Sequence, residues 1–170
     1  MGDTLEGRTA SRMPGLDYAE QRSWQNFLDS ALGVYAALNR SLVDAHQLTL
    51  NDVRLLDVLD RAPSGSARMG DLAEELMSLP SRVTRQLGRL EAHGLACRHS
   101  SPEDGRGVVA CITEQGRELL AEAMVTYGDG VRAHFLKKLS RPQVAALGES
   151  CRRVGVALRA ESVPARLGRV

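Results

Sequence analysis

Hydroxyl and guanidinium side chains gather on one short segment of the chain, residues 79–90. Val83, Leu87 and Leu90 recur there at i, i+4 and i+7, so a helix over this segment has a single apolar stripe. The polar side chains fall largely off that stripe: Ser81, Arg82, Thr84, Arg85 and Arg89. A guanidinium group can bind guanine through two hydrogen bonds or hold a phosphate, and hydroxyl groups bind bases and phosphates as well. These residues indicate a helix suited to the major groove of DNA.

The overall charge of the chain requires any such surface to be local. The 170 residues carry 22 Lys and Arg against 21 Asp and Glu, a formal net charge of +1. Between Arg82 and Arg98, however, four arginines stand against one acidic residue, Glu91, for a local charge of +3. A basic patch of this kind is the electrostatic footprint expected of a nucleic-acid surface.

The segments before this helix are expected to support it. Thr49 is placed to cap a helix, and Asp52 lies at its third position, as in a capping box. A short helix is expected over residues 69–76, followed by a turn. Pro80 then falls in the first turn of the next helix, where its missing N–H costs nothing. Two helices joined by a short turn, with the polar helix second, form a helix-turn-helix.

The segments after the helix change to a strand-like period. Gly94 suits the position just past a helix end. Residues 95–101 and 108–113 favour two short strands around a turn over residues 102–107. A β-hairpin directly after a helix-turn-helix makes a winged helix-turn-helix.

Long helical patterns flank this unit on both sides. Few globular helices are as long as the pattern over residues 18–47 unless they pack against a partner. Thr113 is expected to cap a helix that continues to Leu139. Gly128 and Gly130 lie inside it and indicate a bend or a close helix crossing.

Three stretches are similar to the wing signature of the MarR family of bacterial transcriptional regulators: Gly94-Leu95, Pro102-Glu103-Asp104-Gly105-Arg106-Gly107 and Ile112-Thr113-Glu114-Gln115-Gly116-Arg117. The resemblance covers residues 48–120 closely and the flanking helices by pattern. It implies a homodimer that is joined through its terminal helices and binds a pseudo-palindromic operator in double-stranded DNA. It further implies a repressor, less often an activator, of a nearby operon that responds to a small, commonly aromatic effector.

The predicted fold is mainly α with a small β-hairpin: a winged helix-turn-helix flanked by long N- and C-terminal dimerisation helices. The expected organisation, in chain order, is a disordered N-terminal tail (1–17), an N-terminal dimerisation helix (18–47), a DNA-binding domain (48–113), C-terminal dimerisation helices (114–160) and a polar tail (161–170).

The resemblance also assigns roles by position. The five polar residues of segment 79–90 would face the major groove. Arg106 at the wing tip would enter the minor groove, and Asp104 would hold that arginine or its loop. Small molecules in this family bind between the dimer helices and the DNA-binding lobe, which makes Trp24, Tyr35 and His46 candidate pocket residues. Packing in the core and at the dimer interface is the favoured alternative for these three.

The cysteines allow two interpretations. Three cysteines do not make a disulfide framework, so a reducing cytoplasm is expected. If Ser101 pairs with Gly107 across the hairpin, Cys97 lies opposite Cys111, where a bridge is possible after adjustment. Inert thiols are the expectation, and a redox switch in the wing is the alternative.

Catalysis, metal binding and membrane insertion find no support in the sequence. The four histidines show no metal-ligand spacing, and no nucleophile elbow or phosphate-binding glycine loop occurs. Cys97, His99 and Cys111 on one hairpin are weak grounds for a metal site, so no metal, cofactor or enzymatic activity is expected. No run approaches the roughly 18 apolar residues of a membrane span. The alternatives to a ligand-released repressor are a winged-helix module that binds protein and a regulator switched by its wing cysteines.

Overall fold

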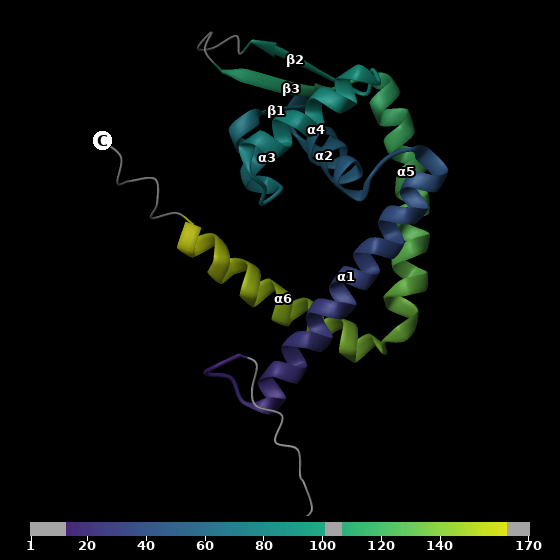
Figure 1. Cartoon of the computed structure of the whole chain (residues 1–170). Coiled ribbons are helices and arrows are strands. Elements are labelled where there is room, and N and C mark those ends of the chain that lie inside the picture. Colours follow the sequence, from purple (N-terminus) through teal and green to yellow (C-terminus); the bar gives the residue numbers. More distant parts are fainter. Residues whose placement is uncertain (1–12, 101–106, 163–170) are drawn as a thin grey trace, which may run out of the picture.

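The computed structural model describes residues 13–100 and 107–162 and is built mainly of helices (Figure 1). In chain order its elements are α1 (Tyr18–His46), α2 (Leu50–Arg61), the short 3-10 helix η1 (Pro63–Gly65), β1 (Ser66–Arg68), α3 (Met69–Glu75), α4 (Pro80–Ala92), β2 (Ala96–Ser100), β3 (Val108–Ile112), α5 (Glu114–His134), the 3-10 helix η2 (Leu136–Lys138) and α6 (Arg141–Ser162). The lobe of α2, α3, α4 and the strands sits at one end of a stalk in which α1 and α5 run side by side (Figure 1).

The predicted fold class is confirmed, with α1, α4 and the hairpin strands close to their expected bounds. α6 leaves the end of the stalk that lies away from the lobe (Figure 1). None of the helices in the two described ranges is both long and apolar enough to cross a membrane. Residues 1–12 and 163–170 of the two predicted tails lie outside those ranges, while Asp17 caps α1 by accepting a hydrogen bond from the Glu20 amide at 2.9 Å.

Local capping signals in the sequence are confirmed at α2 and α5. The Thr49 hydroxyl accepts a hydrogen bond from the Asp52 amide at 3.2 Å, and the Asp52 carboxylate accepts one from the Thr49 amide at 2.9 Å. At α5 the Thr113 hydroxyl accepts from the Gly116 amide at 3.0 Å and donates to the Gly94 carbonyl at 2.7 Å. Thr113 therefore joins the end of α4 to the start of α5, across the base of the sheet.

Two glycines make this junction possible. Gly94 has a φ of +72°, a conformation that L side chains rarely adopt. Gly116 lies against the Leu95 carbonyl oxygen so closely that an added Cβ would overlap it. The turn at Gly94 and the close contact at Gly116 therefore fix the position of α5 relative to the sheet.

The sheet has three strands, one more than the predicted hairpin. Its order is β1-β3-β2, and all pairs are antiparallel. The segment 62–66 is rich in turn residues, and a three-residue strand after it has no alternating pattern to reveal it. β1 forms because the second edge of β3 is available for pairing, a long-range contact that local patterns do not show. The predicted register is confirmed, since Cys97 pairs with Cys111.

The helix after the wing ends earlier than predicted. α5 ends at His134, because Phe135 leaves helical geometry (φ −121°, ψ −65°), and η2 follows. Gly130 marks a close crossing with α1: a Cβ there would lie 2.6 Å from Leu38 Cδ2. A Cβ on Gly128 would meet nothing within 4 Å, so the crossing explains only one of the two glycines.

One apolar core joins the lobe to the stalk. Its members come from every α-helix from α1 to α5. The largest of its fully buried apolar side chains are Leu42, Val53, Leu55, Leu56, Leu59, Leu72, Val83, Leu87 and Leu90. Asp52, only 1% exposed, is the charged residue buried with them. The core fixes the buried side of α4 and so determines which of its residues reach the surface.

Candidate nucleic-acid interface

Helix α4 divides into a buried and an exposed side, as its sequence predicts. Val83 and Leu87 are fully buried and Leu90 is 1% exposed. The hydroxyl and guanidinium side chains lie on the exposed side: Ser81, Arg82, Thr84, Arg85 and Arg89. The Thr84 hydroxyl donates to the Pro80 carbonyl at 2.9 Å, which leaves its oxygen lone pairs available as acceptors.

The first half of α4 presents two cations that no described residue neutralises. Within the described ranges, the guanidinium groups of Arg82 and Arg85 have no hydrogen-bond or ion-pair partner. They stand near the helix N-terminus, whose partial positive charge attracts anions. This half of α4 therefore combines fixed positive charge, hydroxyl groups and an anion-attracting helix end.

The turn before α4 adds a feature that the sequence interpretation missed. Met77 and Leu79 are 66% and 62% exposed, although both are large apolar residues. Met77 adopts a φ of +47° in the turn that reverses the chain between α3 and α4. The sequence gives no signal of this exposure, because Leu79 stands four residues before Val83 and so continues the spacing of the apolar stripe.

Arg89 is paired with a carboxylate of another helix, although its side chain is half exposed, and its contact with DNA stays a prediction. Its guanidinium forms an ion pair with the buried carboxylate of Asp52, across 37 residues of sequence. The same carboxylate completes the capping box of α2, where it also accepts the Thr49 hydroxyl at 2.6 Å. Arg89 thus ties α4 to the start of α2.

Arg98 is also paired with a carboxylate. It forms an ion pair with Glu91, the partner that its place in the sequence indicates, and this hydrogen bond raises the pKa of the Arg98 guanidinium. Asp52 and Glu91 therefore neutralise two of the four arginines that gave segment 82–98 its local charge. Among the described residues, the unpaired positive charge of α4 therefore lies on Arg82 and Arg85.

The two predicted wing contacts, Asp104 and Arg106, lie outside the described residues. The strands that lead to them are described: β2 ends at Ser100 and β3 begins at Val108. On their inner side these strands contribute Ala96, Ala110 and Ile112 to the core.

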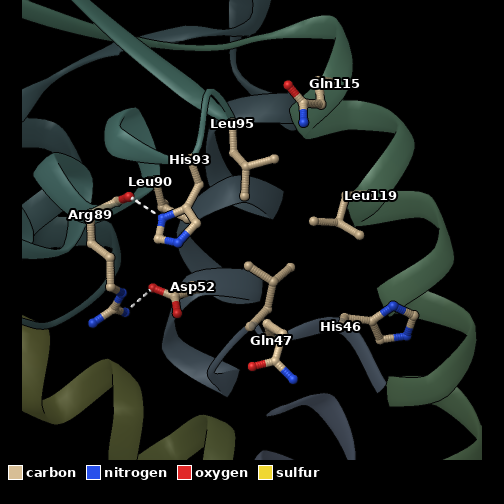
Figure 2. Close-up of a pocket in the computed structure, with 10 residues that line it drawn as sticks. His46, Gln47, Asp52, Arg89, Leu90, His93, Leu95, Gln115 and Leu119 are labelled. Carbon is tan, nitrogen blue, oxygen red and sulfur yellow. Dashed lines mark hydrogen bonds and ion pairs between the residues drawn. The ribbon is translucent and has the colours of Figure 1, made fainter. Parts of the chain in front are cut away.

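A cavity of about 190 Å³ lies where the lobe meets the stalk (Figure 2). Its lining comes from the end of α1, the start of α2, the end of α4 and the start of α5: His46, Gln47, Leu48, Asp52, Arg89, Leu90, His93, Leu95, Gln115 and Leu119. Figure 2 shows the Asp52–Arg89 pair on one side of this cavity and His46 on the other. His46 Nε2 lies 2.8 Å from the Thr126 hydroxyl of α5.

The predicted pocket residues do not come together. His46 lines the cavity, whereas Trp24, near the start of α1, and Tyr35, further along the same helix, are not part of its lining. Trp24 packs its ring 5.9 Å from that of Phe27, and its side chain is 48% exposed.

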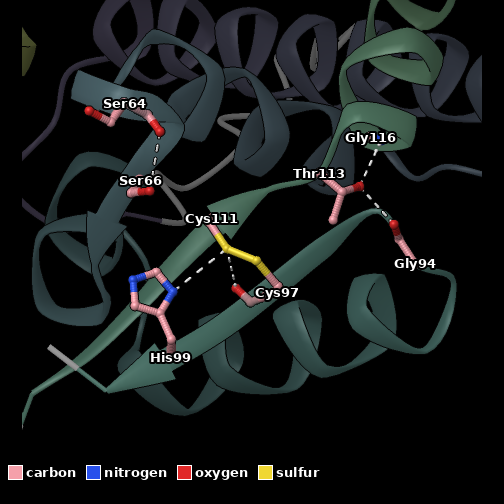
Figure 3. Close-up of a disulfide and its surroundings, with 8 residues drawn as sticks. All are labelled: Ser64, Ser66, Gly94, Cys97, His99, Cys111, Thr113 and Gly116. Atoms are coloured by element: carbon pink, nitrogen blue, oxygen red, sulfur yellow. Dashed lines mark hydrogen bonds between the residues drawn. A yellow bond between two sulfur atoms is a disulfide. The ribbon is translucent and has the colours of Figure 1, made fainter. Parts of the chain in front are cut away.

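The cysteines of the wing differ from the expectation of two inert thiols. Cys97 and Cys111 form a disulfide, with their Cα atoms 5.2 Å apart (Figure 3). Their pairing across β2 and β3 produces this separation, which is within the range that a disulfide spans. Cys151 on α6 is the exposed free cysteine. A response of the pair to redox conditions stays a prediction.

Comparison with known proteins gives consistent matches. A sequence model described as the MarR family matches residues 46–107. The chain is 34% identical over 98 residues to YhbI, an uncharacterized HTH-type transcriptional regulator of Bacillus subtilis, over 52% of this chain and 63% of that relative. The chain spans less than two thirds of the length of the curated relatives it matches.

Two crystal structures from Streptomyces coelicolor share the fold over most of the chain. One is AbsC, a MarR family transcriptional regulator, with a TM-score of 0.80 and 28% identity over 88% of this chain and 99% of that chain. The other is Sco3205, a MarR family transcriptional regulator in complex with DNA, with a TM-score of 0.81 and 30% identity over 84% of this chain and 93% of that chain.

Proposed function

Because the chain belongs to the MarR family of transcriptional regulators, we propose that it is a sequence-specific DNA-binding regulator that acts as a homodimer. The observation that carries this proposal is the first half of α4, where Arg82 and Arg85 are exposed and unpaired within the described ranges. The complex of Sco3205 with DNA supports it. The protein acts by binding alone, without catalysis, and does so in the cytoplasm.

The contacts to DNA follow from the chemistry of that surface. Arg82 and Arg85 bind phosphate or guanine, and Ser81 and Thr84 bind neighbouring groups in the major groove. Leu79 is exposed beside them and provides an apolar surface for a thymine methyl group. In the wing, Arg106 enters the minor groove and Asp104 positions it.

A second copy of the chain covers apolar surface on the terminal helices. α1 exposes Trp24, Phe27, Leu28 and Leu32, and α6 exposes Val154, Val156 and Leu158. In the described ranges α6 packs extensively on no other element. A long helix needs a packed face for stability, and a two-fold partner supplies one. The dimer then places two copies of α4 about one helical turn of DNA apart.

The cavity between lobe and stalk is the proposed effector site. A cavity of roughly 150 Å³ accommodates benzene, so about 190 Å³ suits a molecule with one aromatic ring. His46, His93 and Arg89 line it and would bind an acidic substituent. An acid bound there competes with Asp52 for Arg89, which changes how α4 is held against α2. Such a ligand releases a repressor from DNA only if it binds the two arrangements with different affinity.

Fluorescence anisotropy with the DNA upstream of the gene for this chain tests the proposal. We expect saturable binding at nanomolar dimer to a pseudo-palindromic site and much weaker binding to a scrambled sequence of the same composition. Equal affinity for both sequences would contradict sequence-specific binding. No binding at micromolar dimer and low salt would favour the alternative of a winged-helix module for protein partners.

Light scattering after size exclusion tests the dimer separately. Leu32→Asp places a charge in the exposed apolar surface of α1, where Leu32 is 58% exposed in the single chain. We expect the wild-type chain to elute as a dimer and the variant as a folded monomer. Asp29→Asn, an exposed position on the same helix, serves as the control that stays dimeric.

A further inference from the structure

The outer face of the wing sheet brings together three side chains that bind soft metal ions. Cys97 and Cys111 are directly paired across β2 and β3, and His99 follows Cys97 by two residues on β2. Opposed residues and residues two apart point to the same face of a sheet, so all three share one face (Figure 3). The other face is the one buried in the core through Ala96 and Ala110.

The ligand atoms are close enough for a single ion. The two sulfur atoms and a ring nitrogen of His99 all lie within 4.8 Å of one another, and Cys111 Sγ is 3.9 Å from His99 Nδ1. In a tetrahedral site with Zn–S and Zn–N bonds of about 2.3 and 2.1 Å, sulfur and nitrogen stand about 3.6 Å apart and two sulfurs about 3.8 Å. Rotation of the side chains after reduction is enough to reach these spacings on this backbone.

We propose that the reduced chain binds one thiophilic d10 cation, Zn²⁺ or Cu⁺, through Cys97, Cys111 and His99. Thiolate ligands select these ions over harder cations such as Mg²⁺ or Ca²⁺. Cu⁺ is satisfied by three ligands, whereas Zn²⁺ takes a water molecule as its fourth. Cys97 and His99 are exposed, so the ion exchanges with solution. This site replaces the sequence-based expectation that the chain binds no metal.

The ion and the disulfide exclude each other, because both use the same two sulfur atoms. Reduction of the disulfide adds two electrons and two protons, which a phosphine reductant supplies with water as it becomes the phosphine oxide. The two thiols then release their protons as the ion binds. That the reduced form is the resting form depends on the proposed cytoplasmic location, because thiols are kept reduced there. Metal binding itself does not depend on DNA binding, so each can fail without the other.

Competition with chromophoric chelators tests the site on the full-length protein. The chain is reduced with a phosphine, desalted without oxygen and titrated with Zn²⁺ against a zinc indicator, and with Cu⁺ against a copper(I) chelator. We expect one equivalent of at least one of the two ions per chain and none after oxidation to the disulfide. With Co²⁺ as a zinc probe, thiolate charge-transfer bands in the near ultraviolet report sulfur ligands directly.

Matched variants distinguish this site from other thiols and histidines. Cys97→Ser, Cys111→Ser and His99→Ala each weaken binding by at least about tenfold, since ligand loss exceeds the effect of an outer-shell change. Cys151→Ser and His134→Ala, which leave the three ligands in place, bind as the wild type does. Circular dichroism confirms that each variant is folded. The proposal is overturned if the reduced wild-type chain binds neither ion, or if Cys97→Ser binds as tightly as the wild type.

Discussion

The two halves of α4 carry the same kind of side chain and use it differently. In the first half, Arg82 and Arg85 are exposed and have no partner within the described ranges. In the second half, Arg89 is paired with Asp52, a carboxylate that is 1% exposed. The carboxylate of Asp52 competes with DNA for the guanidinium of Arg89, whereas no described carboxylate does so for Arg82 or Arg85. We propose that the first half of α4 binds DNA and that the second half holds the helix in place.

The largest effect is expected from removing both free arginines of the first half. Arg82→Ala/Arg85→Ala should weaken DNA binding by about 2–4 kcal/mol, or roughly 30- to 1,000-fold, because two charged contacts are lost. The free energy of unfolding should stay within about 0.5 kcal/mol of wild type, since both side chains are exposed. Fluorescence anisotropy and urea unfolding measure the two quantities. A DNA affinity of the double variant within threefold of wild type would contradict the proposal that this surface binds DNA.

Removing the buried carboxylate should instead affect stability. Asp52→Ala loses the two hydrogen bonds to Thr49 and the ion pair with Arg89, which together should cost about 2–3 kcal/mol of unfolding free energy. Asp57→Ala is the control on the same helix, because its exposed pair with Arg61 should be worth less than about 1 kcal/mol. Urea unfolding measures the free energy of unfolding of both variants. Equal losses in the two would mean that the buried contacts of Asp52 stabilise the protein no more than the exposed pair of Asp57 does.

A smaller loss of stability is expected from the cationic partner. Arg89→Ala should cost about 1–2 kcal/mol, because Asp52 keeps its Thr49 hydrogen bonds and water reaches the carboxylate once the long side chain is gone. Arg89→Lys should recover part of that loss by restoring the charge. If Arg89→Ala unfolds as the wild type does, the pair does not anchor α4.

The smallest effect belongs to the pair at the edge of the wing. Arg98→Ala removes a partly exposed ion pair with Glu91 and should cost about 0.5 kcal/mol. The unfolding temperatures of Arg98→Ala and Arg89→Ala are compared with that of the wild type. A larger decrease for Arg98→Ala would contradict the predicted ranking of the two ion pairs.

Much of the fold can be predicted because its signals are local. The capping residues Thr49 and Thr113, the apolar stripe of α4 and the stop at Gly94 all act within a few residues of themselves. The register that pairs Cys97 with Cys111 follows from the length of the hairpin turn.

The remainder depends on contacts between distant segments. β1 forms only because β3 has an edge for it, and α5 ends at His134 although the apolar pattern continues to Leu139. The division of the arginines depends on Asp52, whose place beside Arg89 no local pattern reveals. For the same reason residue type alone groups Trp24 and Tyr35 with His46, while the cavity is assembled from four separate elements.

The salt dependence of DNA binding tests the central claim most directly. Each phosphate contact contributes a little under one unit to the slope of log K against log salt concentration. We predict that Arg85→Ala lowers the steepness of that slope by about one unit, whereas Arg89→Ala leaves it as in the wild type. A slope that falls for Arg89→Ala and stays unchanged for Arg85→Ala would contradict the assignment of the two halves of α4.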